Sequence, residues 1–151
     1  MGFLDAMDIS ASGMSAERIR LDVAAENIAN VDTTRTADGG PYRRKEVALE
    51  SYGDSSFGSV LRKTAAGGQA KASSNKAGVR VSAIVADNSE SKRVYNPDHP
   101  DAGEDGYVEM PNVDVVKETV DGMSATRSYE ANVTALNAIK TMMQKALEIG
   151  T

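Results

Sequence analysis

The amino-terminal part of the chain decides the fold, because residues 4–31 read LDAMDISASGMSAERIRLDVAAENIANV. An apolar residue stands at every seventh position of this stretch, and a second one occupies the companion position of most heptads. The series consists of Leu4, Met7, Ala11, Met14, Leu21, Ala25 and Ile28, with Arg18 as its one charged interruption. Residues three and four apart lie on one face of an α-helix. The stretch therefore predicts a helix with a narrow apolar seam of the coiled-coil type.

Two features limit this helix. Ser12-Gly13 lowers helix propensity, so the sequence predicts a weak point or a bend there. Asn30-Val31-Asp32-Thr33-Thr34 are turn and capping residues, and they predict the end of the helix.

The carboxyl end repeats the design. Apolar residues recur there mostly at steps of three and four, namely Val113, Val116, Val120, Met123, Tyr129, Val133, Leu136, Ile139, Met143 and Leu147. Pro111-Asn112 predicts the entry to this helix and Gly150 its stop, while Gly122 is a weak point that a helix tolerates. At about 1.5 Å per residue, helices of roughly 28 and 36 residues reach about 42 and 54 Å.

The middle of the chain has a different character. Gly39-Gly40-Pro41 and Gly67-Gly68 are loop signals. Short strands of a small antiparallel β element are expected over residues 79–85, 44–49 and 107–110. Residues 65–76 are small and polar, and we expect a loop or a segment that becomes ordered only on assembly.

Together these patterns predict an α+β fold. Long N- and C-terminal helices form a coiled-coil-like pair, and a small β-rich segment lies between them in the sequence. The predicted divisions are residues 1–36 for the N-terminal helix, 37–112 for the middle loop and small β domain, and 113–151 for the C-terminal helix.

Composition and charge exclude several classes of function. The 151 residues include no cysteine, which removes disulfides, thiolate nucleophiles and Cys-ligated zinc. A net charge of -5 disfavours nucleic acid and anionic membranes as partners. We expect no membrane insertion, because no apolar run approaches about 20 residues. The acidic amino end, with no apolar run after it, predicts that there is no cleaved signal peptide.

The sequence offers no catalytic or metal-binding constellation. His99 is the only histidine, and no second histidine or thiol completes a metal site or a triad. Residues 101–106 resemble a calcium loop in part, but Gly103 and Asn112 stand where that loop needs ligands. We therefore expect no enzyme, no metal and no cofactor. The basic patch of residues 42–45, Tyr-Arg-Arg-Lys, is expected to pair with acids on a neighbouring subunit.

Residues 24–34, AAENIANVDTT, resemble the amino-terminal signature of flagellar rod, hook and hook-associated proteins. In physical terms, Ala24, Ala25 and Ala29 permit the close approach of another helix. Asn27 and Asn30 are able to bond to backbone where the helix gives way to a turn. Further matches to the proximal-rod members of this family lie at residues 39–45, 94–102, 106–113, 127–133 and 145–150. Residues 50–92 carry little of the resemblance.

The resemblance implies a structural subunit of the proximal rod of the bacterial flagellum, part of the motor drive shaft. The terminal helices then form the inner layer of a tubular polymer. The implied partners are the rod proteins FlgB, FlgF, FliE and FlgG and the flagellar export apparatus. The implied location is the periplasmic rod of the basal body, reached by type III export from the cytoplasm without a cleaved signal. Phe57 to Leu61 resembles a short export signal of early rod and hook subunits, with an ordinary packed Phe57 as the alternative.

The expected assembly interface is made of the apolar seams at both ends. It contains the seven apolar residues of residues 4–31 named above, Asn27 and Asn30, and Met123, Tyr129, Val133, Leu136, Ile139, Met143 and Leu147. Our hypothesis is that the ends of the isolated chain are poorly ordered and that their seams find partners only in the growing rod. The alternatives are a soluble coiled-coil adaptor or chaperone-like binding protein, in which the same seams form a closed dimer or trimer, and an enzyme.

Overall fold

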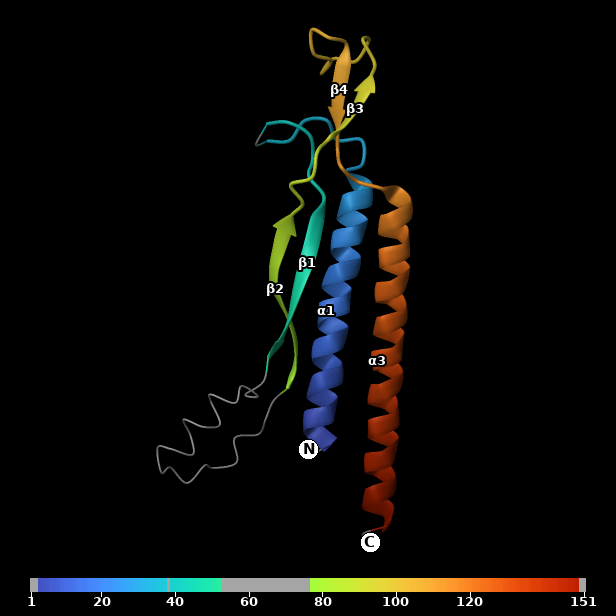
Figure 1. The fold of residues 1–151 in the computed structure, drawn as a ribbon. Coiled ribbons are helices and arrows are strands. Elements are labelled where there is room, and N and C mark those ends of the chain that lie inside the picture. The colour runs from blue at the N-terminus through green and yellow to red at the C-terminus, as the bar shows by residue number, and fades with distance from the viewer. Residues whose placement is uncertain (1–2, 38, 53–76, 150–151) are drawn as a thin grey trace, which may run out of the picture. The chain divides into compact units, whose positions relative to one another are not determined.

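The computed structural model describes residues 3–37, 39–52 and 77–149 (Figure 1). Its elements are α1 (Phe3–Ala29), β1 (Lys45–Tyr52), β2 (Gly78–Ala86), β3 (Lys92–Tyr95), β4 (Tyr107–Met110) and α3 (Val115–Ile149). The predicted α+β class, with a long helix towards each end and a small β-rich middle, is confirmed.

Helix α1 runs without a break through the weak point predicted at Ser12-Gly13. The glycine gives room to Asn132 of α3, because a Cβ at Gly13 would lie 2.9 Å from its Nδ2 and the Asn132 side chain would have to shift. The Ser12 hydroxyl donates to the carbonyl of Ile9 at 2.7 Å and accepts from the amide of Val79 at 3.1 Å. The local loss of helix propensity is thus offset by contacts that the sequence alone does not show.

The helix ends follow the predicted capping residues, with one shift. At the end of α1, Nδ2 of Asn30 donates to the carbonyl of Glu26 at 2.9 Å, which confirms the predicted turn. At the start of α3, Oδ1 of Asp114 accepts from the amide of Val116 at 3.0 Å. The helix therefore begins at Val115, with Asp114 as its N-cap, rather than directly after Pro111-Asn112. Asparagine is as good an N-cap as aspartate, but the Asn112 side chain bonds to Arg44, Asp87 and Ser89 instead.

The strands form two separate two-stranded sheets, β1 with β2 and β3 with β4. All three predicted strands are present within a few residues of their expected limits. Strand β3 has no counterpart among the predicted ones, because its sequence is only Lys-Arg-Val-Tyr and its four residues are all exposed. This segment is a strand because it pairs with β4. The pairing is antiparallel and places Lys92 opposite Met110 and Tyr95 opposite Tyr107. The predicted loop over residues 65–76 lies outside the described residues.

The chain separates into two compact units, and each combines parts of both helices with part of the middle. In the described chain, the first unit contains residues 3–17, 49–52, 77–82 and 127–149, and the second contains residues 18–48 and 83–126. The buried apolar residues of the second unit are Val23, Ala24, Tyr42, Val108, Val113 and Ala125. The described part of the first unit has Ala16 in this class. The core therefore sits mainly in the second unit.

Candidate assembly surface and its supporting network

A buried asparagine organises the second unit. Asn27, near the end of α1, is 0% exposed. Its Nδ2 donates to the carbonyl of Lys45 at 2.9 Å and to Oε2 of Glu118 at 2.8 Å. Its Oδ1 accepts from the amide of Lys45 at 2.9 Å and from the hydroxyl of Tyr42 at 3.0 Å. The amide group thus makes the four hydrogen bonds of which it is capable, and it joins α1, the start of β1 and α3.

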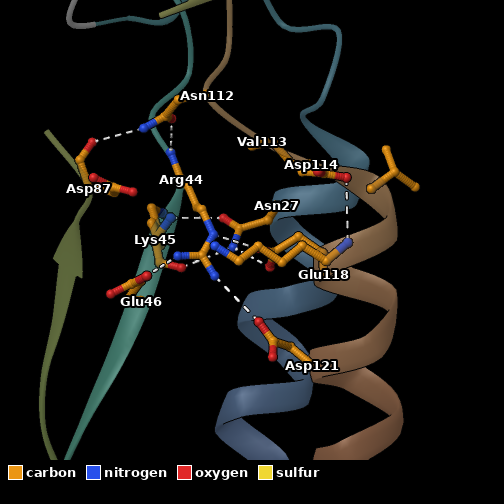
Figure 2. A network of polar contacts seen from close by, with 12 residues as sticks. Asn27, Arg44, Lys45, Glu46, Asp87, Asn112, Val113, Asp114, Glu118 and Asp121 are labelled. Atoms are coloured by element: carbon orange, nitrogen blue, oxygen red, sulfur yellow. Dashed lines mark hydrogen bonds and ion pairs between the residues drawn. The ribbon is translucent and has the colours of Figure 1, made fainter. Parts of the chain in front are cut away.

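A buried ion pair extends this network (Figure 2). Glu118, in the first turn of α3, is 2% exposed, and its Oε1 lies 2.5 Å from Nε of Arg44. The Arg44 guanidinium also pairs with Glu46 and, at 3.4 Å, with Asp121. A buried carboxylate is tolerated only where partners replace its hydration, and here Arg44 and Asn27 supply them. Removal of one partner would leave the other group buried without compensation.

Tyr42 and Lys45 complete the network on the α1 side. Lys45 Nζ lies 2.5 Å from Glu26 Oε1 and 5.7 Å from the centre of the Tyr42 ring. Burial of the Tyr42 hydroxyl, together with the charges of Glu26 and Glu118, raises its pKa to about 12. The hydroxyl therefore remains a hydrogen-bond donor to Asn27 at neutral pH.

Asn112 ties the loops of this unit to the same network. Its Oδ1 accepts from the amide of Arg44 at 2.8 Å. Its Nδ2 donates to the carbonyl of Asp87 at 3.2 Å and to the hydroxyl of Ser89 at 2.7 Å. The amide of Ser89 donates in turn to Asp87 Oδ1 at 2.9 Å, and this bond lowers the pKa of the Asp87 carboxyl. The segment before α3 is thereby held to the residue that precedes β1 and to the residues that follow β2, which adjoin one another at the same end of the sheet.

These contacts correct the prediction for the basic patch at residues 42–45. Arg44 and Lys45 pair with acids of the same chain, and Tyr42 is buried. The prediction of pairing with acids on a neighbouring subunit is wrong for these two cations. Their partners Glu26 and Glu118 are distant in sequence, and no local signal distinguished them from other surface acids. The one local feature of Glu118 is its position in the first turn of a helix. An acid is favourable there because of the helix dipole alone, so this position does not reveal the ion pair with Arg44.

The apolar seams lie largely on the surface of the chain. Leu4 is 72% exposed, Met123 53% and Leu147 67%, and Leu21, Tyr129, Ala11 and Ala25 are also exposed. The other apolar seam residues are half-buried, namely Met7, Met14, Ile28, Val133, Leu136, Ile139 and Met143. Val116 and Val120, the earlier apolar residues of the C-terminal series, are 73% and 59% exposed.

A different face of α1 is the one that is buried. The buried residues of α1 are Ser10, Ala16, Val23, Ala24 and Asn27. Ala16 and Val23 lie on the side of the helix away from the seam, whereas Ser10 and Ala24 are three and four positions from seam residues and therefore border it. Small residues on this face allow close contact. At Gly122 of α3 a Cβ would make an ordinary contact of 3.9 Å with Leu21 Cδ1, so this one seam residue lies beside α3. The contacts within the chain thus use small and polar residues, and the larger apolar side chains are left over.

The two seam asparagines have different positions. Asn27 bonds to backbone as expected, but to that of Lys45 rather than to its own helix end, and its side chain is fully buried inside the chain. Asn30 is half-buried and bonds to the end of its own helix. Phe57 and Leu61, the residues of the expected export signal, lie outside the described residues.

The described chain shows no sign of a reactive centre. His99 Nδ1 accepts from the amide of Asp101 at 3.1 Å, a bond local to its loop. Among residues 3–37, 39–52 and 77–149, no group of three or more His, Cys, Asp or Glu side chains is placed to hold a metal ion. In that same part of the chain, neither helix is apolar enough over a sufficient length to cross a membrane.

Comparison with known proteins agrees with this architecture. Residues 7–35 match the family described as flagella basal body rod protein, and residues 104–149 match the carboxyl-terminal family of the flagellar basal body rod FlgEFG proteins. The two matches cover most of α1 and all of α3 and β4. The long terminal helices and these matches place the chain in the class of flagellar basal-body rod proteins.

The full-length relatives are more specific. The FlgC rod protein of Bacillus subtilis is 51% identical over 149 residues, which cover 95% of each chain. The FlgC of Salmonella typhimurium is 43% identical over 150 residues, 99% of each chain. The FlgC of Borreliella burgdorferi is 41% identical over 155 residues, 99% of this chain and 98% of the relative. The chain belongs to the FlgC family, and it is a structural subunit of the flagellar basal-body rod that associates with other basal-body components.

Proposed function

We propose that the chain is a subunit of the proximal rod and that it polymerises with neighbouring rod proteins through the apolar seams of α1 and α3. In this proposal residues 1–36 and 113–151 form the inner layer of the tube, and residues 37–112 form a small outer domain. The proposed assembly interface consists of the exposed and half-buried seam residues together with the exposed Val116 and Val120. It excludes the Asn27 side chain, which is buried in its own chain.

One observation supports this proposal above others: the large apolar residues of both helices remain uncovered after the chain has folded. Val116, Val120 and Met123 are each more than half exposed and stand at steps of four and three on α3. A run of this kind costs free energy in water, at about 25 cal/mol per Å² of apolar surface that is left unburied. A polymer in which neighbouring helices cover these side chains removes that cost.

The proposed neighbours are FlgB, FlgF, FliE and FlgG, and the proposed route is passage through the flagellar export apparatus without a cleaved signal peptide. In this role the chain needs no catalytic activity, cofactor or metal. Its net charge of -5 gives no support to a nucleic-acid partner. The coiled-coil adaptor remains the weaker alternative, because the relatives along the whole chain are rod proteins.

The test is complementation of a strain that lacks this gene. The wild-type chain should restore motility and rods in isolated basal bodies. Val120→Asp should restore neither, because it places a charge where we expect a neighbour to bury an apolar side chain. Asn137→Asp is the matched control, since Asn137 is an exposed polar residue of the same helix and the change adds the same charge.

Two further measurements make the result decisive. Circular dichroism of the purified variants should show that Val120→Asp and Asn137→Asp fold as the wild type does, since both positions are exposed and valine and aspartate have similar helix propensity. A purified chain that forms a discrete dimer or trimer at every concentration would instead support the adaptor. Normal rods in the deletion strain would disprove the proposal.

A further inference from the structure

We infer that the hairpin of β3 and β4 carries a docking surface for a basic segment of a neighbouring protein, one in which lysine and arginine stand beside apolar residues. This surface, the tyrosine face, consists of Tyr95, Tyr107 and the acidic loop between the two strands. It is separate in the sequence from the seams of α1 and α3. The inference rests on the proposed function only for the assembly in which the partner is met.

The pairing of β3 with β4 places the two tyrosines on the same face of the hairpin (Figure 1). Tyr95 stands opposite Tyr107, and successive side chains of a strand point to opposite faces. Val108, on the other face, is 2% exposed, whereas Tyr95 is 64% exposed and Tyr107 is 45% exposed. The described residues therefore bury Val108 and leave the two aromatic rings uncovered.

The exposed rings are held in place by their surroundings. They meet edge to face, with their centres 5.3 Å apart. The Tyr95 ring also lies against Gly106, where φ is positive and a Cβ would come within 2.9 Å of Tyr95 Cε2. Glycine thus permits both the turn and the close approach of the ring. An aromatic side chain that is fixed before binding loses little conformational entropy when a partner covers it, and tyrosine is enriched at binding hot spots.

The acidic loop indicates the charge of the partner. Residues 98–109 contain no lysine or arginine and five acids, namely Asp98, Asp101, Glu104, Asp105 and Glu109. Asp101 accepts from the Thr34 hydroxyl at 2.8 Å and lies 3.9 Å from the Arg35 guanidinium. The other four carboxylates are exposed and form no ion pair with another described residue. They are therefore available to a cation from outside the chain.

The backbone of the loop keeps these carboxylates near one another. The Asn96 amide donates to the carbonyl of Gly106 at 3.0 Å, and the Gly103 amide donates to the carbonyl of Tyr107 at 3.0 Å. Like charges that a folded loop holds together repel one another, and a cationic partner offsets this repulsion.

The cations of β3 itself do not supply this compensation. Lys92 Nζ donates to the carbonyl of Val113 at 2.8 Å, and the Arg93 guanidinium lies 5.8 Å from the centre of the Tyr107 ring. The contact of Arg93 with Tyr107 also shows how a tyrosine of this face receives a cation, and Tyr95 offers a second ring for such a contact. A basic protein segment with apolar side chains matches both the rings and the acids, whereas nucleic acids and anionic membranes have the wrong charge.

Site-specific photo-cross-linking in isolated basal bodies tests the inference. The photoreactive residue p-benzoyl-phenylalanine replaces Tyr95 in one strain and Val120, on the seam of α3, in another. We expect position 95 to cross-link to a segment of a neighbouring protein in which lysine and arginine outnumber the acids, as mass spectrometry identifies it.

The position of the cross-links separates the inference from the proposed function. Cross-linking of position 95 to a neutral or acidic segment would overturn the inference, and so would its failure to cross-link to protein while position 120 does. Failure at both positions would count against the proposed function as well.

A charge reversal tests the role of the acidic loop. Asp105→Lys, added to the strain with the photoreactive residue at position 95, should lower the yield of that cross-link by at least about fivefold. Glu90→Lys is the matched control, because Glu90 is an exposed acid of the same unit outside the hairpin, and it should lower the yield by less than about twofold.

Stability measurements exclude a trivial cause. Urea denaturation of the purified monomers should show that Asp105→Lys is no less stable than Glu90→Lys, because Asp105 has no ion pair to lose among the described residues. Glu104→Gln is the milder variant and should lower the cross-link yield by a smaller factor than Asp105→Lys. Equal cross-link yields in the wild type, Asp105→Lys and Glu104→Gln would overturn the inference of a basic partner.

Discussion

At the scale of single residues, two of the most deeply buried positions of the described chain hold polar groups. Asn27 and Glu118 are more deeply buried than most apolar side chains of the molecule, and both are fully paired. In the described residues, no buried side-chain nitrogen or oxygen lacks a hydrogen-bond partner. Loss of one partner leaves such a buried polar group without a hydrogen bond, and this lowers the free energy of unfolding. A buried apolar residue of similar size does not carry this penalty.

The first prediction concerns Asn27. Asn27→Ala removes partners from the Lys45 backbone, the Tyr42 hydroxyl and Glu118 at once. We expect the free energy of unfolding to fall by about 2–4 kcal/mol, measured by urea denaturation of the monomer. Asn30→Ala is the matched control and should cost less than about 1 kcal/mol, because Asn30 is half-buried and caps only its own helix. Equal losses for the two variants would contradict a special role of Asn27.

The second prediction is a loss of stability in alkali. The pKa of Tyr42 is about 12 in the folded chain and about 10 when unfolded. The folded state therefore keeps its phenolic proton while the unfolded state loses it, so this contribution is fully present below pH 10 and is lost as pH rises towards 12. Urea midpoints at pH 9, 10 and 11 should fall more steeply for the wild type than for Tyr42→Phe. Parallel curves for the two proteins would exclude Tyr42 as a source of the pH dependence.

At the scale of elements, each helix has a small-residue face turned inward and a larger apolar seam left outside. The inward face of the second unit includes Ala24, Gly122 and Ala125, and the last of these is 1% exposed. Close helix contact with small residues leaves no room for added volume. The seam residues have no such constraint within the chain, since they are exposed or half-buried.

The third prediction compares two alanines of α3. Ala125→Leu should lower the free energy of unfolding by about 1–3 kcal/mol, because the added methylenes enter a filled space. Ala131→Leu, at an exposed position of the same helix, should change it by no more than about 0.5 kcal/mol. Both values come from urea denaturation of the monomer. A neutral Ala125→Leu would show that the inward face is loosely packed.

At the scale of the whole molecule, the chain has one well-filled unit and one that buries little of what is described. The two units share both helices, since each contains part of α1 and part of α3. The chain belongs to the FlgC family of rod subunits, which associate with other basal-body components. We propose that such neighbours cover the seams that the described residues leave uncovered.

The sequence by itself determined the elements whose signals are local. Apolar residues at steps of three, four and seven predicted α1 and α3, and the Asn30 to Thr34 turn predicted the end of α1. Runs of strand-forming residues between loop signals predicted β1, β2 and β4, because backbone propensity and periodicity act over a few residues. The family motif at residues 24–34 was equally local, and the relatives confirm it.

Only the tertiary structure decided which face of each helix is buried and which acids neutralise the basic patch. Asn27 and Glu118 are 91 positions apart, and Arg44 and Glu118 are 74 apart, so no local pattern pairs them. Strand β3 exists because β4 binds it, not because its four residues favour a strand. The sequence pattern marks the seam as the most hydrophobic stripe of each helix. The face that is buried within the chain carries small residues instead, because they allow other elements to approach closely. Packing geometry, which depends on distant residues, thus determined the inner face and left the hydrophobic stripe exposed or half-buried.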